Sequence, residues 1–288
     1  MSEAALTPMP SLYIVATPIG NLEDLTLRAL RVLREVDLIA AEDTRVTRKL
    51  LSRYEIAGRL VSYHEHNSGR RLPELLKALT SGDVALVSDA GTPGVNDPGS
   101  ELVSAAAAAG FPVIPLPGAS AVTTALAVSG LPVGQFVYLG FLPRKRGERT
   151  RLLGPLTNER RTLLAFEAPH RLRGALKDIL DTLGDRRIAV CRELTKLHEE
   201  VFRGTVAEAL EHFGEPRGEL TLVIEGGRGE PDDGADLEAS ARALLVQARA
   251  DGALVKDAVA RAVRETGLSR RAVYRLWLET KDQGMGAD

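Results

Sequence analysis

A short apolar strand followed directly by a long Gly/Pro-rich loop constrains this chain more than any other feature. Residues 84–87 form an apolar run without a helical period, as in a strand buried on both faces of a parallel sheet. The loop after it holds Gly91, Gly94 and two prolines, and Asp97 followed by Pro98 is typical of a helix start. Most strand-to-helix loops need roughly two to six residues, and this one is longer. We therefore expect a rigid, ligand-binding loop at the carboxyl end of a strand.

The same combination of a strand and an unusual following segment occurs three more times in the first part of the chain. The expected strands are Leu12–Ala16, Leu38–Ala41 and Pro112–Leu116. The segments that follow them are Thr17–Asn21, Glu42–Arg45 and Pro117–Ala121. Helical patterns separate the strands, which favours a mostly parallel α/β sheet. Because parallel strands end at a shared edge, we expect the four loops to converge on one site.

The later pattern predicts further domains. The chain has 288 residues, which exceeds one typical domain. A second, mixed sheet is expected from the strands Phe136–Gly140, Thr162–Phe166, Ile188–Cys191, Glu200–Phe202 and Leu220–Ile224. We expect an N-terminal α/β domain at 11–118, a C-terminal α/β domain at 119–226 and a small helical unit at 236–283. Residues 1–10 are interpreted as a loose leader and Gly226–Gly234 as a linker.

The expected helical unit contains two short helices joined by a Gly-containing turn. Apolar residues recur at helical spacing before Gly267 and again around Val273, and Ser269 can cap the second helix. This pattern favours a helix-turn-helix with several arginines on its second helix. A helical hairpin with solvated arginines explains it equally well.

Charge and composition limit the classes of function. The net charge is −2, so any contact with nucleic acid must come from a local patch. Residues 144–161 form such a patch, with seven Lys or Arg against two Glu. Cys191 is the only cysteine, which excludes a disulfide framework and a Cys-based zinc site. The sequence has no signal-peptide pattern and no apolar run of about eighteen residues. We expect a soluble, cytoplasmic protein without membrane contact.

Several common site motifs are absent. No G-x-G-x-x-G follows a strand and no G-x-x-x-x-G-K-[ST] occurs, so the familiar nucleotide-binding fingerprints are missing. His64 and His66 flank Glu65 and could be a metal pair. Alternate polar residues of this kind are more often surface groups, and we expect no metal.

The motifs together resemble a known family. Three segments are similar to those of the tetrapyrrole methylases: Thr17-Pro-Ile-Gly20, the loop Ser88-Asp-Ala-Gly-Thr-Pro-Gly94 with Asp97-Pro-Gly99, and Pro117-Gly-Ala-Ser-Ala121. The segments Glu42-Asp-Thr-Arg45, Phe141-Leu-Pro143, Phe166-Glu-Ala-Pro-His-Arg171 and Cys191-Arg-Glu-Leu-Thr-Lys196 resemble its bacterial branch that methylates the ribose 2′-hydroxyl of a cytidine in 16S ribosomal RNA. The resemblance covers residues 12 to about 226, and the helical tail resembles that branch's C-terminal extension. It implies two α/β domains with S-adenosylmethionine between them, and a homodimer.

The resemblance also implies a set of cofactor-binding residues. They are Pro18, Asp89, Ala90, Gly91, Ser120, Ala121, Phe166, Glu167, Leu194, Glu219 and Leu220. Asp89 can pair with a donor of the cofactor, and Ser120 lies near a helix N-terminus suited to a carboxylate. Asp89 could instead only stabilise its own turn.

Methyl transfer to a hydroxyl needs a positioned acceptor and can use a general base. The candidates at the shared edge are Glu42, Asp43, Glu167, His170 and Glu193. For each of them a salt bridge with a nearby arginine is an equally good explanation, and the sequence does not single out one base.

Three functions are compatible with the sequence. The first is methylation of a cytidine ribose in 16S ribosomal RNA of the small subunit. The second is methylation of a precorrin-type tetrapyrrole, which would not need a long basic segment. The third is a nucleic-acid-binding regulator that uses the helical tail, which would leave the converging loops unexplained. For the first function, the expected RNA-binding residues are Arg144, Lys145, Arg146, Arg149 and Arg151. Charge runs of this kind are otherwise solvated loops.

Overall fold

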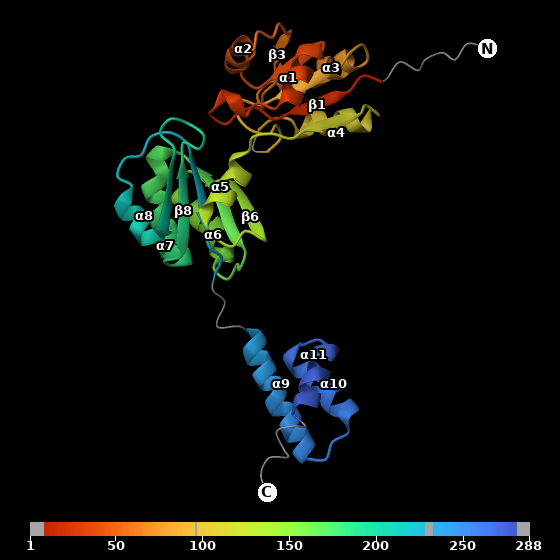
Figure 1. Cartoon of the computed structure of the whole chain (residues 1–288), viewed down its shortest axis with the longest axis vertical. Helices are drawn as coiled ribbons and strands as arrows, with labels where there is room; N and C mark the ends of the chain where they lie inside the picture. Colours follow the sequence, from red (N-terminus) through yellow and green to blue (C-terminus); the bar gives the residue numbers. More distant parts are fainter. Residues whose placement is uncertain (1–8, 96, 228–232, 281–288) are drawn as a thin grey trace, which may run out of the picture. The chain divides into compact units, whose positions relative to one another are not determined.

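The computed structural model describes residues 9–95, 97–227 and 233–280. Most of the expected leader, the middle of the expected linker and residues 281–283 of the expected helical unit lie outside the described residues. The chain divides into two compact units, Met1–Gly226 and Gly227–Asp288 (Figure 1). Among the described residues, no helix combines the length and apolar character needed to cross a membrane.

The first sheet is entirely parallel. Its strands are β1 (Leu12–Val15), β2 (Leu38–Ala41), β3 (Leu60–Ser62), β4 (Val84–Val87) and β5 (Val113–Leu116), in the order β3-β2-β4-β1-β5. The helices that connect them are α1 (Leu27–Glu35), α2 (Thr44–Arg53), α3 (Ser68–Leu79) and α4 (Ser100–Ala108). A short 3-10 helix, η1 (Leu22–Asp24), precedes α1. The central β4 contacts β1 on one side and β2 on the other, so its exit loop lies in the middle of the sheet edge.

Helices cover both faces of this sheet, and this explains the continuous apolar strands. One apolar cluster joins Ile39 to Leu33 of α1 and Leu51 of α2. The cluster on the opposite face joins Leu86 to side chains of α3 and α4, such as Leu102. Strands that are buried on both faces have no polar side, as the sequence indicated.

One predicted helix start is wrong. Helix α4 begins at Ser100 rather than at Asp97, and its N-cap is Gly99, with φ of +149° and no side-chain capping bond. Only glycine adopts such a φ readily, so the chain can turn sharply there before the helix begins. Asp97 consequently lies in the loop.

The second sheet is mixed. Its strands are β6 (Phe136–Phe141), β7 (Thr162–Glu167), β8 (Arg187–Arg192), β9 (Glu200–Thr205) and β10 (Leu220–Ile224), in the order β6-β7-β10-β8-β9. β6 and β7 are parallel, and the other pairs are antiparallel. The helices are α5 (Ala121–Ser129), α6 (Arg146–Leu153), α7 (Leu172–Leu183) and α8 (Val206–His212), with 3-10 turns η2 (Gly154–Leu156) and η3 (Pro169–Arg171).

Helices again cover both faces of the second sheet. α6, α7 and α8 pack on one face around Leu176 and Leu222. α5 packs on the other face, where its Ala125 lies in one cluster with Val223 and Cys191. Cys191 is 1% exposed, and burial raises the pKa of its thiol to about 12. The two α/β layers with terminal helices agree with the predicted fold class, whereas the boundary between 11–118 and 119–226 stays a prediction.

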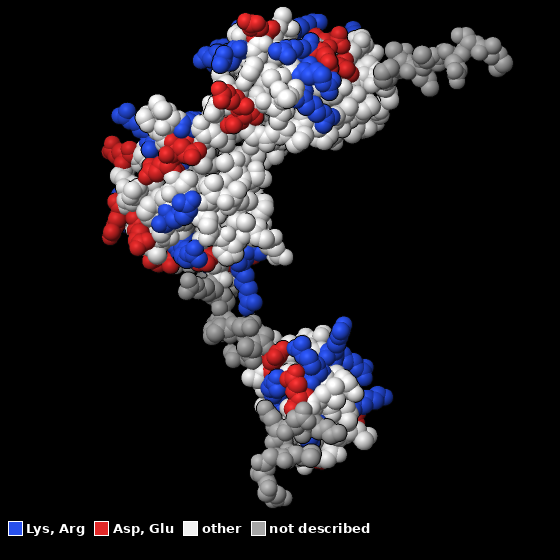
Figure 2. All heavy atoms as spheres, viewed as in Figure 1, with Lys and Arg blue, Asp and Glu red and all other residues white. Residues whose placement is uncertain are grey.

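The second unit is a three-helix cluster. Its helices are α9 (Asp233–Ala250), α10 (Val255–Thr266) and α11 (Arg270–Glu279). Ser269 caps α11 by accepting the Ala272 N–H, as expected. The two predicted helices, α10 and α11, pack against α9, whose Leu245 lies in one apolar cluster with Val259 and Trp277. Figure 2 shows Lys and Arg side chains projecting from this unit.

Candidate functional site

Four loops meet at the carboxyl edge of the first sheet, as the sequence predicted. Thr17 and Gly91 exchange two backbone hydrogen bonds of 2.8 and 3.0 Å, which join the loops after β1 and β4. Asp89 accepts the Asp43 N–H at 2.9 Å, which adds the loop after β2. The loop after β5 approaches so closely that a Cβ on Gly118 would lie 2.9 Å from the Ala16 Cβ.

The central loop needs glycine for its path. Gly91 has φ of +81° and Gly94 has φ of +84°, a backbone region that other residues adopt only with strain. Gly91 also forms the bridge to Thr17. The glycines therefore fix the loop in the position where its neighbour Asp89 contacts a second loop.

A cavity of about 400 Å³ lies at this edge, and we call it the main cavity. Residues of the first sheet's loops line it together with α5 and residues of the second sheet. Nine of the eleven expected cofactor-binding residues are among its lining: Asp89, Ala90, Gly91, Ser120, Ala121, Phe166, Glu167, Glu219 and Leu220. Residues far apart in sequence are thus brought together, while their role in cofactor binding stays a prediction.

The other two expected residues lie beside the main cavity. Pro18 lines a neighbouring cavity, which shares Asp89 and Glu219 with the main cavity. Leu194 is 7% exposed and packs in the same apolar cluster as Ile19 and Phe166. Leu194 therefore packs against side chains that line the main cavity, whereas Pro18 borders the neighbouring one.

The main cavity is acidic. Burial is the largest cause that raises the pKa of each of the carboxyl groups of Glu42, Asp89 and Glu167. Burial, together with the charges of Glu42 and Asp89, raises the pKa of Asp97 to about 6. The described lining residues include no Lys or Arg. A cationic group in this cavity would relieve the repulsion and the desolvation that raise these pKa values.

Glu167 is the most deeply placed of these carboxylates. It ends β7 and is 1% exposed. Its Oε1 accepts the Ala168 N–H at 2.7 Å and pairs with Arg171 at 2.5 Å. Its buried Oε2 has no partner among the described residues. A buried acceptor without a partner is costly, and a ligand donor in the cavity would satisfy it.

Opposite charge comes from a helix end. Ser120 is the N-cap of α5, and its side chain makes no capping bond. Ser120, Ala121 and Val122 all line the main cavity. The N–H groups of the first helical turn and the positive end of the helix dipole are therefore suited to an anion beside the carboxylates.

The structure places only some of the candidate bases in the main cavity. Glu42 and Glu167 line the main cavity, whereas Asp43, His170 and Glu193 are not among its lining residues. Asp43 caps α2 and pairs with Arg45, which holds the pKa of Asp43 at about 2. A carboxylate of such low pKa is a weak proton acceptor, which makes Asp43 a poor base.

The two remaining candidates have other surroundings. A hydrogen bond from Lys196 lowers the pKa of Glu193, which also accepts the Glu219 N–H. His170 is exposed and lines a second cavity next to the main one. His64 and His66 line a third cavity, and no metal-binding cluster of three or more His, Cys, Asp or Glu occurs among the described residues.

The sequence reasoning missed Asp97 as a site residue. It was interpreted as a helix cap, but it lines both the main cavity and the third cavity. The signal was its position in the same loop as Asp89, eight residues further along the chain. A second carboxylate in a loop that is expected to bind a ligand is better interpreted as a site residue than as a helix cap.

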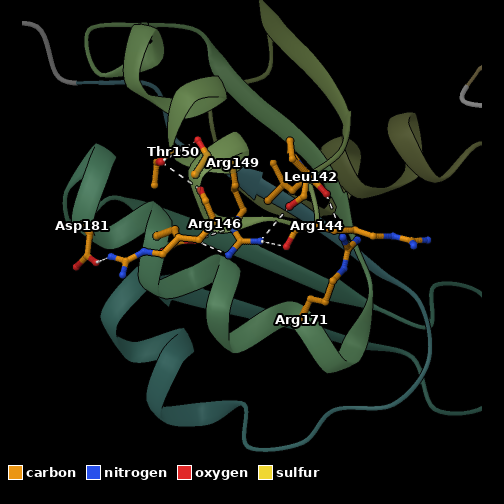
Figure 3. A network of polar contacts seen from close by, with 10 residues as sticks. Leu142, Arg144, Arg146, Arg149, Thr150, Arg171 and Asp181 are labelled. Carbon is orange, nitrogen blue, oxygen red and sulfur yellow. Dashed lines mark hydrogen bonds and ion pairs between the residues drawn. The ribbon is translucent and has the colours of Figure 1, made fainter.

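The expected RNA-binding residues do not all face solvent. They belong to α6 and the loop before it rather than to a solvated loop. Arg149 is only 6% exposed and pairs with Asp178, which excludes a phosphate contact in this conformation. Arg146 remains exposed while pairing with Asp178. It also pairs with Asp181 (Figure 3).

The other three are exposed. Lys145 pairs with Glu148 at 3.3 Å. The side chains of Arg144 and Arg151 have no ion pair or hydrogen bond with any described residue. In Figure 3 the Arg144 side chain extends away from the network around Arg149. Four of the five expected RNA-binding residues are therefore exposed cations: Arg144, Lys145, Arg146 and Arg151.

Comparisons with known proteins agree with this geometry. A protein of Synechocystis called ribosomal RNA small subunit methyltransferase I is 48% identical, and the match covers 96% of this chain and all of the relative. A protein of the same name from Thermotoga maritima is 52% identical over 76% of this chain and 99% of its own length. The crystal structure of uroporphyrin-III-C-methyltransferase from Thermus thermophilus has a TM-score of 0.51 and 25% identity, and covers 74% of this chain and 93% of its own.

The family pattern described as tetrapyrrole (corrin/porphyrin) methylases matches residues 11–210, which include both sheets' cavity-lining loops up to β9. Such a match spans more than half of the chain, and the relatives cover nearly all of it. The chain therefore belongs to the tetrapyrrole (corrin/porphyrin) methylase family.

Proposed function

We propose that the protein transfers a methyl group from S-adenosylmethionine to the ribose 2′-hydroxyl of a cytidine in 16S ribosomal RNA of the small subunit. The observation that carries this proposal is the similarity along 96% of the chain to a ribosomal RNA small subunit methyltransferase I. Methyltransferase relatives of this kind use a methyl donor, and the main cavity is the place for it.

The residues of the main cavity fit this cofactor. S-adenosylmethionine carries a sulfonium, an ammonium, a carboxylate and ribose hydroxyls. The carboxylates of Glu42, Asp89 and Asp97 suit the positive charges, and the N-terminus of α5 suits the carboxylate. The buried Glu167 Oε2, which has no partner among the described residues, can accept from a hydroxyl. The volume of about 400 Å³ lies within the roughly 300–1,000 Å³ of small-molecule sites.

The chain's own residues contribute chiefly by position. The bound cofactor supplies a methyl group on a positively charged sulfur. The loops after β1, β2 and β4 are hydrogen-bonded to one another, so they hold the carboxylates in fixed places. Asp97, whose pKa burial raises to about 6, is one lining carboxylate that can accept a hydroxyl proton near neutral pH. Glu42 lines the same two cavities and is the second candidate.

The basic segment would bind the RNA. Exposed Arg144, Lys145, Arg146 and Arg151 can contact phosphates, whereas Arg149 holds the segment in place. The helical unit is proposed to assist RNA docking without taking part in methyl transfer. The Thermotoga maritima relative is consistent with this role, because its whole length matches only about as much chain as the first unit contains. A homodimer in the cytoplasm completes the proposal.

Methyl transfer to two substrates tests the proposal. Purified small ribosomal subunits and a precorrin-type tetrapyrrole would be incubated with the protein and radiolabelled S-adenosylmethionine. We expect label in 16S RNA, at a cytidine ribose, and none in the tetrapyrrole. Label in the tetrapyrrole alone would overturn the RNA assignment and favour the alternative that the uroporphyrin enzyme's fold suggests. A Gly91→Val variant, strained by its positive φ, serves as the control without a functional cavity.

A further inference from the structure

Phe141 is an exposed aromatic residue that the architecture holds at the rim of the main cavity. Its side chain is 59% exposed, although burying a phenylalanine would stabilise the fold. Phe141 lines the main cavity and also the second cavity. The other lining residues of the second cavity are Leu142, Pro143, Arg144, Ala168, His170 and Arg171. The ring therefore forms the wall between the proposed methyl-donor site and a neighbouring apolar and basic hollow.

A β-bulge determines where this ring points. On β7, Leu164 pairs with Tyr138 and Phe166 pairs with Phe141, so three steps along β6 correspond to two along β7. Gly140, with φ of +66°, lies within this irregular stretch. Residues three apart on a regular strand face opposite sides, but the extra residue turns Phe141 to the side that Tyr138 occupies.

The result is a row of three aromatic rings. Phe166 makes edge-to-face contacts with Tyr138 at 5.5 Å and with Phe141 at 5.4 Å between ring centroids. Phe166 is the middle ring of the row. Tyr138 and Phe166 are partly buried, and Phe141 is the exposed end. The ring is thus fixed by packing at its edge while a face is left for a ligand.

Two arginines fix the loop that follows Phe141. Arg171, paired with Glu167, donates to the Leu142 carbonyl at 3.3 Å. Arg149, paired with Asp178, donates to the Pro143 carbonyl at 3.0 Å and to the Arg144 carbonyl at 3.4 Å. Three consecutive carbonyls are therefore held (Figure 3), and the Arg144 side chain next to them remains exposed.

We propose that Phe141 is a stacking platform for an unstacked RNA base at the acceptor site, with Arg144 contacting the adjacent phosphate. This inference rests on the proposed function. Unpaired RNA bases are recognised by stacking on aromatic side chains, and phosphates by exposed cations. A rigid ring beside a basic side chain, at the mouth of the donor cavity, presents both groups where the acceptor ribose must lie.

The test separates stacking from charge and from cofactor binding. Affinity for small ribosomal subunits would be measured across a salt series for Phe141→Ala, Phe141→Leu, Phe141→Trp and Arg144→Ala. We expect Phe141→Ala and Phe141→Leu to weaken binding about tenfold, with an unchanged log–log salt slope. Phe141→Trp should retain wild-type affinity. Arg144→Ala should flatten the slope by about 0.7, the value for one single-strand phosphate contact.

Controls distinguish the possible failures. Leu27→Ala removes another exposed apolar side chain, 85% exposed on α1, and should leave RNA affinity unchanged. Calorimetry should show that Phe141→Leu binds S-adenosylmethionine within about twofold of wild type. Loss of cofactor affinity with unchanged RNA affinity would overturn the inference and limit Phe141 to a role in cofactor binding. If wild type methylates small subunits while Phe141→Leu binds them equally well, only the stacking role fails. If wild type does not methylate them, the proposed function itself fails.

Discussion

The main cavity and the basic segment are both strongly charged, but the protein pairs their charges with opposite ones to different extents. In the main cavity, carboxylates gather without a Lys or Arg among the described lining residues, and their pKa values are raised. In the basic segment, Arg149 and Arg146 share the carboxylate of Asp178. The carboxylates of the main cavity have no cation beside them in its described lining, and they mark the place where a ligand is expected. The ion pairs of Arg146 and Arg149 instead stabilise the fold. The most conspicuous cluster of charge in the sequence is thus partly structural.

The largest expected effect tests whether the paired arginines of the basic segment stabilise the fold. Arg149→Met removes one partner of a buried ion pair, and the free energy of unfolding is expected to fall by about 3–5 kcal/mol. Arg151→Met, on the exposed face of the same helix, should change it by less than about 0.5 kcal/mol. Urea unfolding of both variants measures the difference. Equal stability of the two variants would mean that Arg149 is available for RNA after all.

The next effect concerns a carboxylate of the main cavity, Asp89. Asp89→Ala should weaken S-adenosylmethionine binding about 10- to 100-fold, because a charged hydrogen bond contributes about 1.5–3 kcal/mol. Asp89→Asn keeps an acceptor for the Asp43 N–H and removes only the charge. Titration calorimetry that shows a loss in the alanine variant alone would assign Asp89 to loop structure. Unchanged affinity in both would remove it from the cofactor site.

A salt series examines how many cations of the basic segment reach phosphate. The four exposed residues among the expected RNA-binding ones predict a log–log slope of RNA affinity against salt near −3, at about 0.7 per contact. Replacing Arg144, Lys145 and Arg146 together by Ala should flatten the slope by about two units and leave cofactor affinity unchanged. Arg53→Ala, an exposed arginine on α2, is the matched control. An unchanged slope in the triple variant would direct attention to the helical unit.

The pH dependence of cofactor binding reports on Asp97. Its pKa of about 6 means that it is charged above pH 7 and neutral near pH 5, so affinity for a cationic cofactor should fall up to about tenfold across that interval. Asp97→Asn should flatten this dependence. Because its folded-state pKa is raised, the charged form destabilises the fold as pH rises, and the same variant should gain stability at pH 7 more than at pH 4. A pH profile identical to wild type would exclude Asp97 as the titrating group.

The smallest expected effect on the main cavity comes from removing the second unit. A chain ending at Gly226 should bind S-adenosylmethionine within about twofold of the full chain, because the units are compact separately. Its affinity for small ribosomal subunits should be lower. Loss of cofactor binding would show that the helical unit completes the first unit, which would contradict the proposed division.

Strand positions were predictable because they depend on local composition. β2, β4 and β10 have the bounds that the sequence indicated, since each is a largely apolar run covered on both faces. The convergence of the loops followed from the parallel order of the strands alone. Helix α6 was not predicted, because it has only one fully buried aliphatic side chain, Leu153, and no apolar stripe.

Long-range pairing explains the rest of what was missed. The burial of Arg149 depends on Asp178, which lies 29 residues further along the chain on another helix. The position of Asp97 in the main cavity depends on the backbone turn at Gly99. Neither the Arg149–Asp178 pair nor the effect of the Gly99 turn on Asp97 can be recognised in a local sequence pattern. Residue type and spacing therefore indicated the right segments, but predicted an RNA contact for Arg149 and a helix cap for Asp97.

The buried thiol of Cys191 has a practical consequence for experiments in solution. With a pKa of about 12, it carries almost no thiolate at neutral pH, and its side chain is out of reach of reagents. It is also the chain's single cysteine. A cysteine introduced in place of exposed Leu197 or Arg144 would therefore be the one group that a fluorescent dye or spin label modifies, without prior removal of the native residue.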